Sequence, residues 1–407
     1  MDQQTTDLPP PLRGTDLDSF THQTITDRWP HILRRTMEEA DYPAPINDRI
    51  RALIDDLPDA PIRPLDDPQA PDAALWNERI EPYRGQSWLE APWFFGETYL
   101  YRRLLEATGY FQPGPGRHVD PFSEQKRRGL AGSIDAVRAV ARTRERARAE
   151  DTDSRHELAR LLKMALWGNQ ADLSMWGAGE DAPDHLESGE EDAHLLADDT
   201  GAVLNHLDGL DRPARIDVWA DNVGVELVAD LALADALLTS GLADPLVLHV
   251  KAHPTFVSDA TVGDVHGTLR RLAADDDPAT RALADRLHDA IELGRLQIRD
   301  PLTWTSPLRA REFPTTVNAE LARADLVVSK GDANYRRLVG DRHWAFTRPF
   351  GEVVSYFPAP LLALRTLKAE VVCGLSADQV ERLNETHPGW LTSGEWGVIQ
   401  FAPGPAP

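Results

Sequence analysis

The chain contains a single cysteine, Cys373, among its 407 residues. One cysteine can form no internal disulfide and supplies too few thiolates for a cysteine-based zinc cluster. The sequence therefore excludes both of these stabilising features. The surrounding sequence, EVVCGL, is apolar and β-branched. We therefore expect Cys373 to be a buried strand residue rather than a reactive thiol.

Long hydrophobic runs and a signal-type leader are also missing. No apolar run reaches ~18 residues, the length at which a transmembrane helix becomes a candidate. The N-terminus, MDQQTTDLPPPLRG, is polar and proline-rich and lacks the basic-then-apolar pattern of a secretory signal. We expect a soluble, cytoplasmic protein that does not bind a membrane.

Positive charge is scarce in this sequence. Lysine and arginine number 43 against 66 aspartates and glutamates, which gives a formal net charge of −23. An acidic surface gains nothing from counterion release on nucleic acid, so we expect no nucleic-acid partner. The apolar content of 42% and the 11 tryptophans are typical of a well-packed globular protein with one large domain or two ordinary ones.

The apolar pattern divides the chain into a leader and two larger parts. Residues 1–15, with three consecutive prolines, predict a disordered leader. Residues 16–195 place apolar residues three and four apart, which is typical of an all-helical domain; its last part, 177–195, is acidic and predicts an exposed loop. Residues 196–407 alternate strand-like runs with helical patterns and predict an α/β domain.

The order of elements in the second part predicts the kind of sheet. The expected strands are Ile216–Ala220, Leu246–Val250, Leu296–Arg299, Leu326–Ser329 and Glu370–Cys373. The expected helices between them are Val225–Thr239, Val262–Ala273, Pro278–Glu292 and Thr315–Ala324. Strands that alternate with helices form largely parallel sheets covered on both faces. Ligands of such sheets bind beyond the carboxyl ends of the strands.

Oxygen-bearing side chains follow two of these strands. Asp221 and Asn222 come directly after the first run, and Asp259 lies in FVSDAT beyond the second. Carboxylate and amide oxygens suit a hard divalent cation. Alternatively, each of these residues caps the helix that follows it. Glu226, in the first turn of the next helix, is either a partner of the metal site or an acid that complements the helix dipole.

Basic residues come later in two places. The segment KGDANYR, Lys330–Arg336, follows the strand-like run LVVS, and Gly331 would let the backbone approach a ligand closely. Lysine and arginine can hold phosphate oxygens, although six polar residues also make an ordinary solvated turn. Arg365 and Lys368 precede the run Glu370–Cys373, and they reach the same sheet edge if that strand is antiparallel to its neighbours.

These segments resemble the DUF89 damage-control phosphatases. The motifs DNVGVE, FVSD, SKGDANYR and RTLKAE are similar, in the same order, to those of the subgroup that carries RTxK near the C-terminus, the acidic residue methyltransferase 1-like proteins. The resemblance spans roughly residues 20 to 376. It implies an N-terminal all-helical domain packed on a Rossmann-like α/β/α three-layer sandwich with a mostly parallel sheet.

The resemblance also implies roles for individual residues. Asp221, Asn222 and Asp259 would hold the metal. Substrate would be bound by Asp221, Asn222, Asp332, Ala333, Asn334, Tyr335, Arg336 and Lys368. Of these, Asp221, Arg336 and Lys368 are expected to be catalytic. Asn169 and Asp172, in the family-like segment LWGNQADLS, are expected to reach the same site.

The activity implied by the resemblance is hydrolysis of small phosphate monoesters. Sugar phosphates such as fructose 1-phosphate or fructose 6-phosphate would be the substrates, and manganese, nickel, cobalt or magnesium the cofactor. Oxygen-rich ligands fit all four ions. We expect a metal-activated water to attack phosphorus. The alternative, attack by Asp221 with an aspartyl phosphate intermediate, is less favoured because the DxD motif of haloacid dehalogenase-type enzymes is absent.

Two other functions remain open at this point. One is a carboxyl methyltransferase that uses S-adenosylmethionine, an activity proposed within the same family. No glycine-rich GxGxxG-type turn follows any expected strand, which argues against it. The other is a non-catalytic protein that binds a metal or a sugar phosphate.

Overall fold

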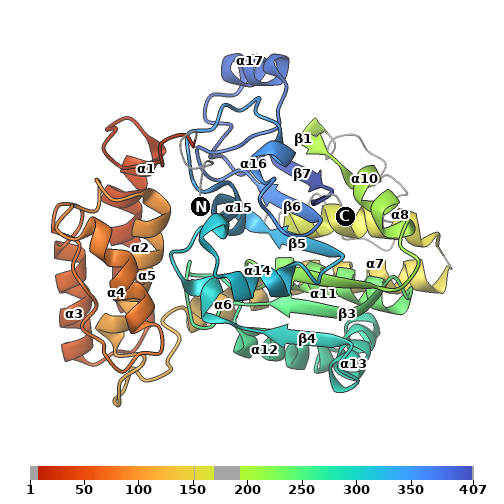
Figure 1. Cartoon of the computed structure of the whole chain (residues 1–407). Helices are drawn as coiled ribbons and strands as arrows, with labels where there is room; N and C mark the ends of the chain where they lie inside the picture. Colours follow the sequence, from red (N-terminus) through yellow and green to blue (C-terminus); the bar gives the residue numbers. More distant parts are fainter. Residues whose placement is uncertain (1–7, 151, 169–192, 406–407) are drawn as a thin grey trace.

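The computed structural model describes residues 8–150, 152–168 and 193–405. A layer of helices from the N-terminal part stands beside an α/β sandwich (Figure 1). The helices of this layer are amphipathic or wholly buried, as their apolar spacing predicts. Their bounds are α1 (Phe20–Gln23), the π-helical turn η1 (Thr24–Arg28), α2 (Trp29–Glu39), α3 (Ala44–Asp55), α4 (Ala73–Ile80), the 3₁₀ turn η2 (Glu81–Tyr83) and α5 (Trp93–Thr108).

The remaining elements build the sandwich. Its strands are β1 (Leu195–Asp198), β2 (Ala214–Trp219), β3 (Ala243–His249), β4 (Leu296–Arg299), β5 (Leu326–Lys330), β6 (Leu361–Thr366) and β7 (Gly397–Ala402). Its helices are α6 (Ser123–Gly132), α7 (Ile134–Ala149), α8 (Ser154–Trp167), α10 (Thr200–Asp208), α11 (Val225–Thr239), α12 (Val262–Ala273), α13 (Pro278–Glu292), α14 (Thr315–Leu321), α15 (Gly331–Val339), α16 (Phe350–Val353) and α17 (Ala377–Thr386). Two 3₁₀ turns are η6 (Leu302–Thr305) and η7 (Ala310–Glu312).

The seven strands form one mostly parallel sheet in the order β1-β7-β6-β5-β2-β3-β4. The sole antiparallel pair in the described sheet is β6 with β7. The strand predicted at Glu370–Cys373 is wrong: that segment is irregular, and the strand of this region is β6, which is parallel to β5. Cys373 is buried as predicted, but outside any strand.

The two faces of the sheet are covered by different helices. Side chains that alternate along β2 divide between two apolar clusters: Ile216 and Val218 pack with α7, α8, α11 and α13, whereas Trp219 packs with the 3₁₀ turns, α16 and the N-terminal layer. The predicted helical domain extended to residue 195, but α7 and α8 pack against α11 and are part of the sandwich. Apolar periodicity shows that a helix has a buried face without showing what covers it.

The N-terminal segment is tied to residues far along the chain. The predicted disorder does not extend to residues 8–15, since Leu12 is buried and its backbone N–H donates to the Asp341 carbonyl at 3.0 Å. Prolines exclude a helix here but allow this extended pairing. Further on, the Glu370 carboxylate accepts backbone hydrogen bonds from Phe20 and Thr21 at the start of α1, at 3.1 and 3.3 Å.

None of the helices in the described ranges is both long and apolar enough to cross a membrane.

Candidate active site

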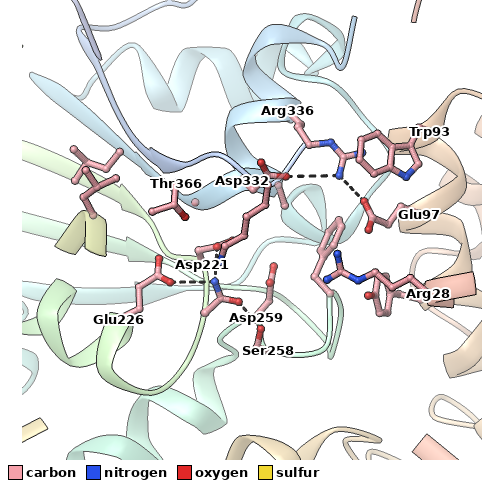
Figure 2. Close-up of a pocket in the computed structure, with 18 residues that line it drawn as sticks. Arg28, Trp93, Glu97, Asp221, Glu226, Ser258, Asp259, Asp332, Arg336 and Thr366 are labelled. Atoms are coloured by element: carbon pink, nitrogen blue, oxygen red, sulfur yellow. Dashed lines mark hydrogen bonds and ion pairs between the residues drawn. The ribbon is translucent and has the colours of Figure 1, made fainter. Parts of the chain in front are cut away.

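A cleft opens where β2, β5 and β6 end, with about 820 Å³ of empty volume. The chain leaves β2 for β3 on one side and returns to β5 on the other, so this edge is the switch point at which such sheets bind ligands. We call it the sheet-edge cleft (Figure 2). Its lining comes from both the sandwich and the helical layer: Arg28, Trp93, Glu97, Tyr101, Leu166, Asp221, Asn222, Glu226, Phe256, Ser258, Asp259, Gly331, Asp332, Ala333, Arg336, Leu364, Thr366 and Lys368.

Two loops bring the three predicted metal ligands together. Asn222 and Asp259 form an isolated antiparallel bridge, so the loop after β2 and the loop after β3 run side by side. The Asp221 carbonyl accepts a hydrogen bond from the Ala260 N–H at 2.8 Å, which fixes the register. The sequence predicted this convergence from strand order, and the structure places Asp221, Asn222 and Asp259 on the wall of one cleft.

The Asn222 side chain links the acidic groups of the cleft. Its Nδ2 donates to Asp221 Oδ2 at 2.7 Å and to Glu226 Oε2 at 3.0 Å. Its Oδ1 accepts a hydrogen bond from the Ser258 hydroxyl (Figure 2). Glu226 therefore contacts the predicted ligands directly, which places it beside the site rather than only at a helix end.

The carboxylates of the cleft are buried close together. Asp221 is 6% exposed and Asp259 is 1% exposed. Burial, and then the negative charges of Asp259 and Glu226, raise the pKa of Asp221 well above its usual value. Burial also raises the pKa of Asp259, although its ion pair with Lys251 Nζ at 3.0 Å opposes the shift. Two clustered carboxylates with elevated pKa values form a site that additional positive charge would stabilise.

A second buried ion pair lies behind this group. Lys330 Nζ contacts Glu226 Oε1 at 3.0 Å and Asp230 Oδ1 at 2.8 Å. Burial raises the pKa of Asp230 to about 7, against the opposing charge of Lys330. Because Lys330 is held by these two carboxylates, it neutralises the floor of the cleft and is not directed at a ligand.

The donor set fits a hard divalent cation. Asp221 and Asp259 supply carboxylate oxygens and Asn222 an amide oxygen, the ligand types that Mg²⁺ and Mn²⁺ prefer. Within the described residues, no group of three or more His, Cys, Asp or Glu side chains is placed to hold a metal. The set of two carboxylates and one amide therefore also needs oxygen atoms from substrate or water.

The N-terminus of α15 faces the same carboxylate. Gly331 begins α15 with φ of +81° and lines the cleft, and the Asp221 carboxylate lies against it. Lys330, at the N-cap, makes no side-chain capping hydrogen bond. The first N–H groups of a helix have no intrahelical partner and attract anions. This end of the cleft thus combines anionic oxygens with donors suited to a phosphate.

Arg336, predicted to hold phosphate, already has two carboxylate partners. Its Nη1 contacts Glu97 Oε2 at 2.5 Å, and its Nε contacts Asp341 Oδ1 at 2.8 Å. The guanidinium also stacks 3.7 Å from the ring centre of Trp93. It lies 3.9 Å from Asp332, so it borders the cleft while tying the sandwich to the helical layer (Figure 2).

Two cations of the cleft have no carboxylate partner in the described part of the chain, Lys368 and Arg28. Lys368 was predicted, although it reaches the cleft because it follows the parallel strand β6, not because it precedes an antiparallel one. Arg28 was missed. It ends the π-helical turn η1 and extends into the cleft from the helical layer (Figure 2). Its local sequence, TITDRW, carries no motif, although π-turns often occur at functional sites.

The other predicted substrate residues divide into two groups. Asp332 and Ala333 line the cleft. Asn334 and Tyr335 do not: the Asn334 Nδ2 donates to backbone carbonyls, including that of Lys330 at 2.9 Å, and the Tyr335 hydroxyl donates to Gln400 Oε1 at 3.0 Å. Both are 1% exposed, so they support the start of α15 from behind. Asn169, Asp172 and most of the predicted acidic loop lie outside the described residues.

Comparison with known proteins agrees with the resemblance of the motifs. A sequence profile described as the damage-control phosphatase ARMT1-like domain matches residues 24–383. Damage-control phosphatase ARMT1 of Danio rerio is 34% identical, covering 97% of this chain and 97% of that protein. Its namesakes from Bos taurus and Homo sapiens are each 32% identical, covering 97% of this chain and 98% of theirs.

Among solved structures, the crystal structure of a DUF89 family protein from Pyrococcus horikoshii matches with a TM-score of 0.49 and 16% identity, covering 93% of this chain and 96% of that one. The profile match over most of the sequence, with the three full-length relatives, confirms the predicted family. The chain belongs to the damage-control phosphatase ARMT1-like family.

Proposed function

We propose that this chain is a metal-dependent phosphatase of small phosphate monoesters, with sugar phosphates such as fructose 1-phosphate or fructose 6-phosphate as substrates. The observation that carries the proposal is the meeting of Asp221, Asn222 and Asp259 beside the N-terminus of α15. Phosphoryl transfer needs charge neutralisation and positioning more than covalent help from the protein. This arrangement offers both at one strand end.

The metal would be held by Asp221, Asn222 and Asp259, with manganese, nickel, cobalt or magnesium as candidates. A divalent cation bound there supplies Lewis acidity to the phosphate group and to the attacking water. The protein's own residues would do the rest. The N–H groups that begin α15 would bind phosphate oxygens, and Lys368 and Arg28 would neutralise the negative charge on the phosphoryl group as it is transferred to water.

The sugar would lie between the two layers. Glu97, Asp332 and Thr366 line the cleft and carry oxygens that can form hydrogen bonds with hydroxyl groups. Trp93 lines the same wall and offers an apolar surface. We assign Arg336 a positioning role, because its ion pair with Glu97 and its 3.9 Å contact with Asp332 orient both carboxylates.

The test is release of inorganic phosphate from a panel of sugar phosphates. Metal-stripped protein is assayed with Mn²⁺, Ni²⁺, Co²⁺ or Mg²⁺ restored, beside Asp221→Asn as the inactive control. Metal-dependent release with a preference among sugars is the expected result. Folded protein that binds a sugar phosphate without releasing phosphate would instead be a non-catalytic binder, and the proposal would be wrong.

The route of attack needs a separate experiment. We propose attack by water, because the Asp221 carboxylate, which lies beside Asn222 and Asp259 in the cleft, would be engaged in holding the metal. In a rapid acid quench during a single turnover, phosphate should appear in solution with no phosphorylated protein. A phosphoryl group on the Asp221 carboxylate, trapped by borohydride reduction and detected by peptide mass spectrometry, would show an aspartyl phosphate instead.

A further inference from the structure

A second cleft lies between the helical layer and the sandwich, with about 540 Å³ of empty volume. Its apolar lining consists of three aromatic residues and four prolines. Tyr83 and Phe95, with ring centroids 4.5 Å apart, form one side, and Phe94 and Pro307 also line it. Small-molecule sites combine such walls with a few polar groups. The walls of this cleft suit a flat apolar group.

Arginines gather at this cleft. Arg79 and Arg309 line it, from the helical layer and the sandwich respectively. Arg342 is adjacent to Gly340, which lines the cleft: a Cβ added to Gly340 would lie 3.5 Å from Arg342 Nε and 3.9 Å from Arg309 Cδ. We call it the arginine cleft. In a chain with a net charge of −23, such a concentration of positive charge attracts anions locally.

Two carboxylates line the cleft, Glu312 and Asp341, and Asp341 is engaged by Arg336. Glu312 holds Arg309 at 2.7 Å. Arg79 contacts the exposed Glu78 at 3.6 Å, and its buried Nε has no hydrogen-bond partner among the described residues. Arg342 donates to a backbone carbonyl and has no carboxylate partner in the same ranges. Burial, and then the positive charge of Arg309, lower the pKa of Arg342. An anion bound in the cleft would offset this repulsion.

One residue joins the arginine cleft to the sheet-edge cleft. Asp341 lines the arginine cleft, and its Oδ1 holds Arg336 Nε at 2.8 Å. Its Oδ2 accepts a hydrogen bond from the Phe94 N–H at 2.9 Å. Phe94 lines the arginine cleft, whereas its neighbour Trp93 lines the sheet-edge cleft and stacks on Arg336. A ligand bound beside Asp341 would change the electrostatic potential at this carboxylate, and with it the ion pair that holds Arg336 in place.

We propose that the arginine cleft is a second binding site, for a small molecule that carries a carboxylate or phosphate group on a flat apolar body, and that its occupancy acts on Arg336 through Asp341. The aromatic walls take the apolar body. Arg79 and Arg342 bind the anionic group, with the planar forks that suit both kinds of oxygen anion.

Saturation-transfer NMR on the full chain tests the site with two probes, benzoate and phenylphosphonate, which separate the two head groups. Both are expected to bind the wild type, and Arg79→Ala/Arg342→Ala should weaken the better probe at least tenfold. Arg28→Ala, which removes an arginine from the sheet-edge cleft, should leave that affinity unchanged. The proposal is overturned if neither probe binds, if the double variant binds equally well, or if Arg28→Ala abolishes binding.

The link to Arg336 has its own readout, which does not depend on catalysis. The Arg336 Nε–Hε resonance, assigned with Arg336→Lys, should shift when the better probe is added to the wild type and not to the double variant. An unchanged resonance at saturation would overturn the link. If the double variant does not fold, Arg79→Gln/Arg342→Gln removes the same charges with less loss of packing and is measured in its place.

Discussion

Gly331 lies against the carboxylate of Asp221 so closely that no other residue fits there. A Cβ added to Gly331 would stand 1.9 Å from Asp221 Oδ2. The φ of +81° at Gly331 independently favours glycine. The position of Asp221, the first predicted metal ligand, therefore depends on the absence of a side chain at Gly331, 110 residues later in the sequence, where α15 begins directly after the neighbouring strand β5.

Gly331→Ala should abolish phosphatase activity while the chain still folds. The methyl group would push Asp221 away from Asn222 and Asp259, so cation binding should fail with it. Gly241→Ala is the matched control, because Gly241 has φ of +77° but nothing within 4 Å of an added Cβ. Both variants should lose about 1–2 kcal/mol of stability from the left-handed backbone. Urea unfolding and the cation-induced rise in Tm measure the two effects; equal activity in both variants would contradict the steric argument.

Asp221→Asn should lower activity at least 100-fold and leave the metal-free protein as stable as the wild type or more so. Burial raises the pKa of Asp221, so its charged form is unfavourable in the folded protein and the neutral amide removes that cost. Mn²⁺ should raise the Tm of the wild type and not of the variant. Asp244→Asn, at a half-exposed position on β3, is the control. A variant that fails to fold would indicate that Asp221 is a structural cap.

Arg28→Ala should raise KM for sugar phosphates about tenfold, because a charge-assisted contact is worth roughly 1.5–3 kcal/mol. Arg28→Lys should recover part of the loss, and Arg34→Ala, an exposed arginine of α2, should behave like the wild type. Lys368→Ala should raise KM and lower kcat together, since phosphate contacts strengthen as charge develops. Steady-state kinetics of the four variants separate these roles; an unchanged KM in Arg28→Ala would exclude Arg28.

Acid should weaken the contact between the helical layer and the sandwich at Asp72. Burial opposes ionisation of Asp72, but hydrogen bonds with His253 and Arg102 outweigh it and lower its pKa from 3.8 to about 2. A carboxyl group whose pKa is lower in the folded protein than in the unfolded chain stabilises the folded state at pH values above its unfolded-state pKa. That stabilisation is lost as the pH falls from about 4 to about 2. The shift corresponds to about 2 kcal/mol. Urea unfolding of the wild type and Asp72→Asn should differ by this amount at pH 5 and converge as the pH falls toward about 2; a constant difference would contradict this prediction.

Much of the sandwich was predictable because its strands and helices have strong periods. Val225–Thr239, Val262–Ala273 and Pro278–Glu292 match α11, α12 and α13 at both ends, and β4 matches Leu296–Arg299. The C-terminal part of the sheet was not predictable, because one of its buried apolar runs does not form a strand. The run Glu370–Cys373 is buried but irregular, whereas LLALRT forms β6 between a proline and a turn. Burial alone does not distinguish these segments.

The site was predictable to the extent that its residues follow strand ends. Asp221, Asp259 and Lys368 reach the cleft for that reason. Arg28 and Glu97 come from helices of the other layer, and no sequence spacing connects them with residues more than 100 positions away. The roles of Asn334 and Tyr335 depend on which side of α15 faces the cleft, and the short polar motif that contains them does not specify this.

The hydrogen bonds from the start of α1 to Glu370 span 350 positions of sequence. A chain made from its N-terminus exposes α1 and the extended segment before it long before their partners, Glu370 and Asp341, have been synthesised. Domains commonly fold in the order of their synthesis. Here α1 leaves the ribosome early but is among the last helices to be fixed, so a nascent chain stalled before residue 370 should leave its N-terminal segment open to proteases and chaperones.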